Sequence, residues 1–285
     1  MRSKKLKLMV GALLVTMVGA TFVGCGSNGS EGEDNNTASN KDSVTISISG
    51  STSVGPLMEK IQEKYEEENS NVTLEIQQNG SGAGIKDVIS GISEIGMSSR
   101  ELKDEEKGSV EGTTIAYDGI ALLVNPNNTV KNISLEDVKK IYTGEITNWK
   151  DLGGEDAPIV VVSREEGSGT RDAFQEIVGY ESEELTKDAS ISDGSGAVKT
   201  TVAGNKNAIG FASFEYIDDT VSALSVNDVE PTAENVKAGD YKISRPFLLV
   251  TSKDTLTDEG QKLIDFVLSS EGQQIVKDNK LITIE

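Results

Sequence analysis

The stretch IVVVSREEGSGTRDAFQEIV, residues 159–178, holds the pattern that decides the fold. Its first four residues are apolar and mostly β-branched, which predicts a buried strand. Glycine and hydroxyl residues follow at 167–170, and apolar residues then recur at 173, 174, 177 and 178, the spacing of one face of a helix. A strand that leads through such a loop into a helix predicts an α/β architecture.

The same strand–loop–helix unit recurs along the chain. Its Gly/Ser/Thr loops lie at 50–53 (GSTS), 80–84 (GSGAG), 167–170 (GSGT) and 194–196 (GSG). Strands that alternate with helices in this way predict a largely parallel sheet. Residues 115–124 predict an apolar strand interrupted by Asp118 and Gly119, and the apolar spacing through 258–280 predicts a C-terminal helix.

Each of these loops places the start of a helix beside glycine and hydroxyl groups. A helix N-terminus exposes unpaired N–H groups and the positive end of the helix dipole, and Ser or Thr adds a hydroxyl donor. A single such loop is well explained by Ser or Thr acting as a helix N-cap. Several together, one of them led by Arg164, predict instead that they converge on a small oxyanion. Glu166 is expected to orient Arg164 through an ion pair, and a solvated surface acid is the alternative.

The composition excludes several classes of function. The chain has 285 residues, no His, one Cys and a formal net charge of −20. Without His there is no Ser-His-Asp triad and no His metal ligand, and one Cys forms neither an internal disulfide nor a Cys-clustered metal site. Nucleic acid is an unsuitable partner for so acidic a chain, because its phosphates require a basic surface.

The first 24 residues predict an export signal. Four positive charges within the first seven residues precede an apolar run at 8–23, and Cys25 follows directly. This end of the run resembles a bacterial lipobox, in which the Cys is lipidated; an ordinary secretory signal with an incidental Cys is the alternative. Residues 26–42 are Gly, Ser, Asn and charged residues with almost no apolar side chain, so residues 25–42 are expected to form a flexible tether.

Seven motifs along the chain resemble those of the phosphate-binding lipoproteins of ABC-type phosphate importers, the PstS family. They are GSTSVGPL (50–57), QNGSGAGI (78–85), EIGMSSR (94–100), IAYDGIALLVNP (115–126), IYTGEITNWKDLGG (141–154), SREEGSGTRDAF (163–174) and NAIGFASF (207–214). The resemblance implies a two-lobed periplasmic-binding-protein-like fold of type II. Each lobe is then a mixed sheet flanked by helices, with the ligand in the cleft between the lobes.

The resemblance also implies which residues contact phosphate. Matched motif by motif, they are Thr52, Ser53, Ser81, Arg164, Ser168, Gly169 and Thr170. Many members carry an Asp that accepts the phosphate proton and helps to reject sulfate, but this chain has Ser99 at that position, followed by Arg100. Asp118 is either the replacement acceptor or a structural cap where the chain passes between lobes. Arg100 is either a second cation for the ligand or a surface charge.

The resemblance implies a non-catalytic receptor without a cofactor. It would be a monomer, lipid-anchored through Cys25 to the outer face of the cytoplasmic membrane. It would capture inorganic phosphate there and deliver it to the permease and ATPase subunits of an ABC importer. Lobe 1 is expected at 43–122 and 245–285, and lobe 2 at 123–244. The alternatives are a binding protein for sulfate or molybdate, a metal-dependent phosphatase, and a surface adhesin or scaffold.

Overall fold

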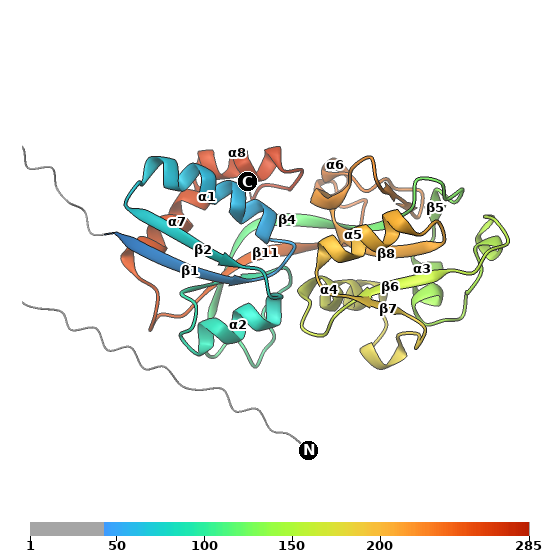
Figure 1. Ribbon diagram of the computed structural model, residues 1–285, viewed down its shortest axis with the longest axis horizontal. Helices are drawn as coiled ribbons and strands as arrows, with labels where there is room; N and C mark the ends of the chain where they lie inside the picture. The colour runs from blue at the N-terminus through green and yellow to red at the C-terminus, as the bar shows by residue number, and fades with distance from the viewer. Residues whose placement is uncertain (1–42, 285) are drawn as a thin grey trace, which may run out of the picture. The chain divides into compact units, whose positions relative to one another are not determined.

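The structure is a computed structural model that describes residues 43–284. The predicted signal peptide (1–24), the lipidation site Cys25 and the predicted tether (25–42) lie outside the described residues. Strands and helices alternate along the described chain and form two lobes, each with a sheet flanked by helices (Figure 1). The predicted two-lobed α/β fold is therefore confirmed.

The strands of the main sheet follow one spatial order through both lobes. In that order they are β2 (Val72–Gln77), β1 (Val44–Gly50), β3 (Ile95–Ser98), β11 (Ser244–Thr251), β4 (Glu111–Val124), β8 (Ala208–Ser213), β6 (Val160–Arg164) and β7 (Ser190–Ser192), with β9 (Ser222–Ala223) also paired to β4. A small second sheet pairs β5 (Asn132–Ile133) with β10 (Ser225–Val226).

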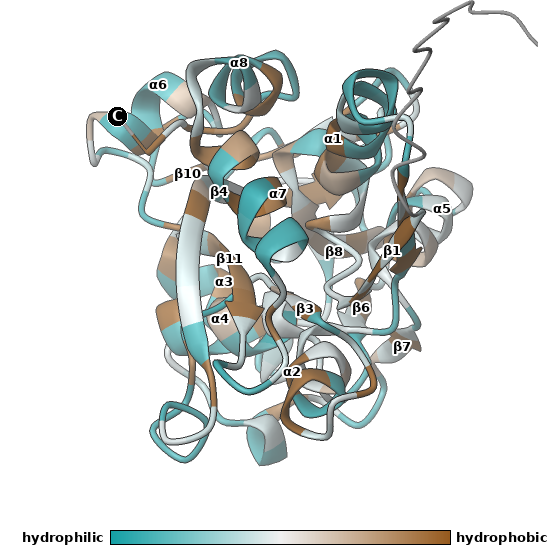
Figure 2. Ribbon diagram, turned by 90° about the vertical axis from the view of Figure 1, so that its left-hand side faces the viewer, coloured by the Kyte–Doolittle hydropathy of each residue, from teal (hydrophilic) through white to brown (hydrophobic). Residues whose placement is uncertain are grey.

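The helices lie between these strands in the chain. They are α1 (Gly55–Glu68), α2 (Ser81–Ile89), α3 (Leu135–Tyr142), α4 (Gly169–Val178), α5 (Ser195–Gly204), α6 (Ala233–Lys237), α7 (Asp258–Leu268) and α8 (Ser270–Asp278), with 3₁₀ turns η1 (Trp149–Leu152), η2 (Ser182–Glu184) and η3 (Phe214–Tyr216). Helices α1, α7 and α8 show both hydrophilic and hydrophobic residues in Figure 2, as expected for helices that cover a sheet.

The sheet is mixed, as the family resemblance implied, rather than largely parallel, as the alternation of strands and helices predicted. Parallel pairing is confined to its two ends, where β1 pairs with β2 and β3, and β6 pairs with β7 and β8. In the middle, β11 runs antiparallel to β3 and β4, and β4 runs antiparallel to β8. The prediction of a largely parallel sheet was wrong because β4 and β11 carry the chain from one lobe to the other.

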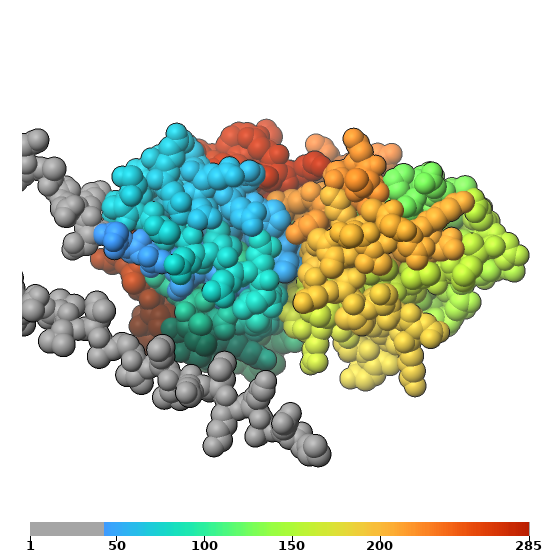
Figure 3. All heavy atoms as spheres, in the orientation of Figure 1, coloured from blue at the N-terminus to red at the C-terminus, as the bar shows by residue number. Residues whose placement is uncertain are grey.

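The largest hydrophobic core of each lobe lies in that lobe alone, and a smaller third cluster packs α2 against β11 in lobe 1. Lobe 1 packs β1, β2 and β3 against α1, α7 and α8, and lobe 2 packs β6 and β8 against α3, α4 and α5. On β4, Ile115 and Ala116 belong to the core of lobe 1 and Ile120 to that of lobe 2. The lobes meet along a seam in Figure 3, and their predicted boundaries in the sequence stay a prediction.

Strand β4 passes through the crossing without a break, so Asp118 and Gly119 do not interrupt it. A Cβ atom on Gly119 would lie 2.0 Å from the ring of Phe214, so only glycine admits that ring against the strand. On β11, Arg245 pairs in register with Asp118. The two long strands therefore bring a buried cation and a buried acid together between the lobes.

The predicted C-terminal helix is two helices. Helix α7 ends at Leu268 and α8 begins at Ser270. Ser269 has an extended backbone between them, and its hydroxyl accepts a hydrogen bond from the Gly272 N–H. The apolar spacing continues across this N-cap, so periodicity alone did not reveal the break.

Candidate functional site

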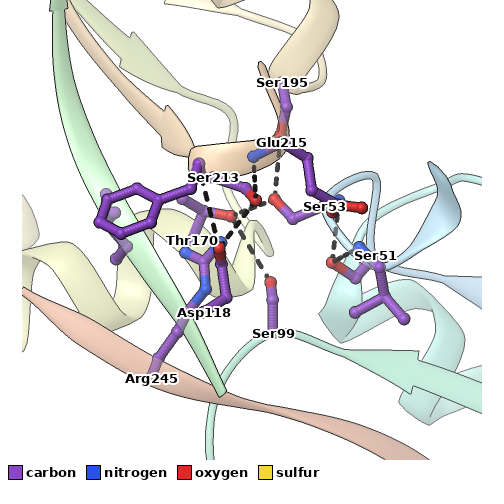
Figure 4. A network of polar contacts seen from close by, with 12 residues as sticks. Ser51, Ser53, Ser99, Asp118, Thr170, Ser195, Ser213, Glu215 and Arg245 are labelled. Atoms are coloured by element: carbon purple, nitrogen blue, oxygen red, sulfur yellow. Dashed lines mark hydrogen bonds and ion pairs between the residues drawn. The ribbon is translucent and has the colours of Figure 1, made fainter. Parts of the chain in front are cut away.

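Hydroxyl groups from loops far apart in the sequence meet between the lobes (Figure 4). Ser53 Oγ lies 2.8 Å from Thr170 Oγ1 and 3.0 Å from Ser195 Oγ. Ser99 Oγ lies 3.3 Å from Ser81 Oγ and 3.5 Å from Thr170 Oγ1. We call Thr52, these five residues and Arg164 the hydroxyl cluster.

Both lobes contribute to the hydroxyl cluster. Thr52 and Ser53 follow β1, Ser81 opens α2 and Ser99 follows β3, all in lobe 1, whereas Thr170 and Ser195 lie in the first turns of α4 and α5 in lobe 2. The backbones also meet, since the Gly82 N–H donates to the Gly167 carbonyl over 3.0 Å. Helix N-termini and hydroxyl donors thus face one another across the seam, as the sequence predicted for an oxyanion site.

Glycine at position 169 is required for this close approach. A Cβ atom there would lie 2.4 Å from Ser81 Oγ and 3.0 Å from Ser99 Oγ. Packing holds the rest of α4 in place, because the ring of Phe174 stacks on Phe211 of β8 with centroids 4.1 Å apart. The helix start is therefore fixed against its own lobe while its first residues touch the other.

Arg164 is buried at the centre of the hydroxyl cluster. Its Nη1 donates to Ser195 Oγ over 2.9 Å and its Nη2 to Thr52 Oγ1 over 3.1 Å. Its Nε and Nη2 also donate to the two carboxylate oxygens of Glu165, over 2.7 and 2.6 Å. Glu165 thus holds one edge of the guanidinium, and the other N–H groups point at hydroxyls.

The acid that orients Arg164 is Glu165, and the prediction of Glu166 was wrong. Glu166 is exposed, whereas Glu165 is half-buried and also accepts the Gly194 N–H over 3.2 Å. Burial by itself raises the pKa of Glu165, but the hydrogen bonds and charge of Arg164 and the Gly194 N–H together hold it below its usual value. Glu165 is therefore ionised at neutral pH.

Ser168 caps a helix at the edge of the hydroxyl cluster. Its buried hydroxyl accepts the Arg171 N–H over 3.2 Å at the N-terminus of α4. This is the N-cap role that the sequence offered as an alternative for each such loop. A hydroxyl that accepts from the backbone still has a proton to donate, so contacts of Ser168 and Gly169 with a ligand stay predictions.

Asp118 is fully buried at the crossing and is engaged there. Its carboxylate accepts from Ser213 Oγ over 2.9 Å and from the Phe214 N–H, and it pairs with Arg245 at 2.8 Å. Burial raises the pKa of Asp118 to about 6, against the charge of Arg245 and these hydrogen bonds, which lower it. Asp118 makes no hydrogen bond to the hydroxyl cluster. Its geometry therefore favours the structural role at the crossing between the lobes over the role of replacement acceptor.

Arg100 lies outside the hydroxyl cluster. It is buried, with 6% of its surface exposed, so it is not a surface charge. Its guanidinium pairs with Glu106 at 2.8 Å and with Asp172 at 3.0 Å, and it reaches no hydroxyl of the cluster. Glu106 accepts two hydrogen bonds from the guanidinium, whereas Asp172 is held by charge without a hydrogen bond from Nε.

Sequence reasoning missed four residues around the site. The sequence indicates a Gly/Ser loop at 194–196, but it does not single out Ser195 as a residue of the site. Glu165 and Arg245 could not be told from other charges, because their roles depend on partners that only folding brings near. Tyr216, whose hydroxyl donates to the Thr52 carbonyl over 2.7 Å across the seam, carried no signal in the sequence.

The described residues offer neither a metal centre nor a membrane span. Within 43–284, no three acidic or Cys side chains are grouped so that they could hold a metal ion. No helix in the same range is long and apolar enough to cross a bilayer.

The fold and the site together define a class of binding protein. The profile of the PBP superfamily domain matches residues 35–271, most of the chain. The phosphate-binding protein PstS of Bacillus subtilis is 35% identical over 100% of this chain and 95% of its own length, and that of Borreliella burgdorferi is 30% identical over 84% of this chain and 90% of its own.

Solved structures agree with these matches. A Clostridium perfringens protein with bound phosphate, assigned to an ABC transporter for phosphate, is 58% identical, with a TM-score of 0.83 over 85% of this chain and 100% of that one. An ABC-type phosphate transport receptor from Vibrio cholerae is 35% identical, with a TM-score of 0.71 over 84% of this chain and 99% of that one. The chain belongs to the PstS family of phosphate-binding proteins.

Proposed function

We propose that this chain is an extracytoplasmic receptor that binds inorganic phosphate in the hydroxyl cluster and delivers it to an ABC-type phosphate importer. The observation that carries the proposal is the meeting of hydroxyls from both lobes around one buried guanidinium, within 3.5 Å of one another. The names of the relatives support the choice of phosphate as the ligand.

The chemistry of the cluster suits a tetrahedral oxyanion. Each hydroxyl is both a donor and an acceptor, so the groups that now bond across the seam can turn to the oxygens of phosphate instead. The buried site is shielded from water, which strengthens each of these hydrogen bonds. Because Glu165 neutralises only one edge of Arg164, the cation still offers two N–H directions to the anion.

Binding is coupled to closure in this proposal. The contacting groups are divided between the lobes, so an oxyanion satisfies them together only when the lobes are close. Phosphate therefore shifts the population towards the closed state through its higher affinity for that state. The closed form then docks on the permease of the importer.

Membrane attachment is proposed from the sequence alone. Lipidation of Cys25 would anchor the chain to the outer face of the cytoplasmic membrane, with residues up to about 42 as tether. Mass spectrometry of the mature N-terminus tests this attachment: a diacylglyceryl thioether on Cys25 supports it, and an unmodified Cys25 contradicts it.

The test of the binding site is calorimetric titration of the mature domain with phosphate, in competition with sulfate and molybdate. We expect phosphate to bind and Arg164→Gln to weaken it roughly tenfold to a hundredfold, because two charge-assisted hydrogen bonds are lost. Lys199→Gln is the matched control, since it removes one positive charge from α5, where Lys199 pairs with Asp218 on the surface.

Three results would contradict the proposal. Wild-type protein that fails to bind phosphate would remove the assigned ligand. Tighter binding of sulfate or molybdate would support the other oxyanion class, which stays open because Ser99 is not a carboxylate. Unchanged phosphate affinity in a folded Arg164→Gln variant, checked by circular dichroism, would show that the cluster is not the site.

A further inference from the structure

A second set of charged side chains joins the lobes outside the hydroxyl cluster. Arg100 follows β3 in lobe 1, and its Nε lies 3.0 Å from a carboxylate oxygen of Asp172 on α4 in lobe 2. Lys103 of lobe 1 lies 3.3 Å from the same oxygen. Two cations of one lobe thus hold one acid of the other.

Arg100 is oriented towards lobe 2 by its own lobe. Its Nη1 and Nη2 donate to both carboxylate oxygens of Glu106, each over 2.8 Å, and Nη1 also donates to the Glu101 carbonyl. Burial raises the pKa of Glu106, but the hydrogen bonds and charge of Arg100 and the Lys103 N–H lower it by more. The pKa therefore lies below its usual value, and Glu106 is ionised at neutral pH. The fork is therefore occupied within lobe 1. Nε makes no hydrogen bond among the described residues, and its 3.0 Å contact with Asp172 is an ion pair.

Burial makes the two contacts to Asp172 unequal. The side chain of Arg100 is 7% exposed and that of Asp172 26%, whereas Lys103 is 50% exposed. Charges with little access to water interact more strongly than exposed ones, so most of the attraction lies between Arg100 and Asp172. The contacts border a groove of about 700 Å³ lined by residues of both lobes.

Asp172 is also placed to transmit this attraction to the binding site. It lies in the first turn of α4, two residues after Thr170, whose hydroxyl contacts Ser53 of lobe 1. Holding Asp172 therefore holds the helix start that carries part of the hydroxyl cluster. Arg100 and Glu106 share lobe 1 while Asp172 lies in lobe 2, so separation of the lobes would break the contact with Asp172 and leave the Arg100–Glu106 pair.

We propose that Arg100 and Asp172 form an interlobe latch that favours the closed state and thereby raises ligand affinity without either residue touching the ligand. The inference rests on the proposed function and adds two positioning residues to it. It differs from the expectation that Arg100 is a second cation for the ligand, and the two roles make opposite predictions for Asp172.

The decisive variant is Asp172→Asn, measured for phosphate affinity and for the rate of phosphate release. As a latch, Asp172→Asn weakens phosphate binding about threefold to fivefold and speeds release, because the closed state loses an ion pair. If Arg100 binds phosphate instead, Asp172→Asn frees the cation, and affinity stays the same or rises. That result would overturn the latch.

A double-mutant cycle isolates the pair. Arg100→Gln, Asp172→Asn and the combined variant are compared, and the latch requires that the combination be little weaker than either single variant. Additive losses would show that Asp172 acts through the helix dipole of α4 and not through Arg100. Asp104→Asn is the matched control, since it removes the same charge from an exposed pair with Lys107 within lobe 1, and it should leave affinity unchanged.

Small-angle X-ray scattering separates failure of the latch from failure of the proposed function. Without phosphate, the latch predicts a larger radius of gyration for Asp172→Asn than for wild-type protein or Asp104→Asn, because fewer molecules are closed. That difference is expected even if phosphate proves to be the wrong ligand. Identical scattering of the three proteins together with identical affinities would overturn the proposal.

Discussion

Two buried arginines, Arg164 in the hydroxyl cluster and Arg245 at the crossing between the lobes, are each paired with a carboxylate in a different way. Arg164 takes its acid from the next residue of the chain, Glu165, and directs two further N–H groups at hydroxyls. Arg245 takes its acid, Asp118, from the neighbouring strand, 127 residues away. Its Nε and Nη1 have no hydrogen-bond partner among residues 43–284.

The difference separates a binding cation from a structural one. A neighbour in the chain can stay with Arg164 whether the lobes are open or closed, so the remaining donors are free to exchange partners. Asp118 and Arg245 instead join the two strands that connect the lobes, and Arg245 also lies over the ring of Phe247 at 5.4 Å. Burial and an ion pair alone therefore do not identify an arginine that binds the ligand. What distinguishes Arg164 is that its remaining N–H groups point at the hydroxyl cluster.

The largest expected effect is the loss of stability in Arg245→Met. Removing the cation leaves Asp118 buried and unpaired, which should lower the free energy of unfolding by about 3–5 kcal/mol. Urea unfolding followed by circular dichroism measures it. Phosphate affinity, titrated at a temperature where the variant is folded, should change little.

The control for this variant is Arg245→Met combined with Asp118→Asn, which removes the orphaned charge and should recover part of the stability. The comparison between the two arginines would break if Arg245→Met unfolded like wild-type protein but bound phosphate poorly. Arg245 would then be a ligand residue as Arg164 is proposed to be.

The sequence predicted those features that depend on local chemistry. The strand–loop–helix units and the hydroxyl groups at helix starts follow from periodicity and glycine placement within a few residues. The motif resemblance supplied the two lobes. The break at Ser269 was local as well, but the apolar spacing on both sides concealed it.

Partner choice between distant segments could not be predicted. Glu165 and Glu166 differ only in the direction of their side chains at the end of β6, which the fold decides. Arg100 finds Asp172 only after β3 and α4 come together, and Arg245 finds Asp118 only because β4 and β11 are in register. A charge in a sequence thus indicates that a partner exists without identifying it.

A smaller effect should come from Glu215, beside the crossing. Both of its carboxylate oxygens are buried and have no hydrogen-bond partner among the described residues. Burial, with the charge of Asp118, raises the pKa of Glu215 from 4.5 to about 9, against Arg245 and Lys280, which lower it. The folded chain therefore holds a proton that the unfolded chain releases.

The sign of the pH dependence follows from that proton. Stability from protonated Glu215 is present below about pH 4.5 and is lost as the pH rises towards about 9. Glu215→Gln cannot release this proton. Between pH 4.5 and about 9, the free energy of unfolding of the variant should therefore fall by at least about 1 kcal/mol less than that of wild-type protein. Urea unfolding at several pH values measures both slopes, and parallel slopes would mean that Glu215 is ionised in the folded protein.

The smallest effect is expected at Ser168, where the capping and binding roles meet in one hydroxyl. Ser168→Ala should lower the free energy of unfolding by about 1 kcal/mol through loss of the α4 cap, and phosphate affinity by about fivefold through loss of one neutral hydrogen bond. Ser168→Gly separates the two roles, because glycine costs a helix N-terminus only a few tenths of a kcal/mol. If the hydroxyl contacts phosphate, both variants lose affinity and only Ser168→Ala loses stability. If phosphate affinity is unchanged in both Ser168 variants, Ser168 has a structural role only, as Arg245 is expected to have.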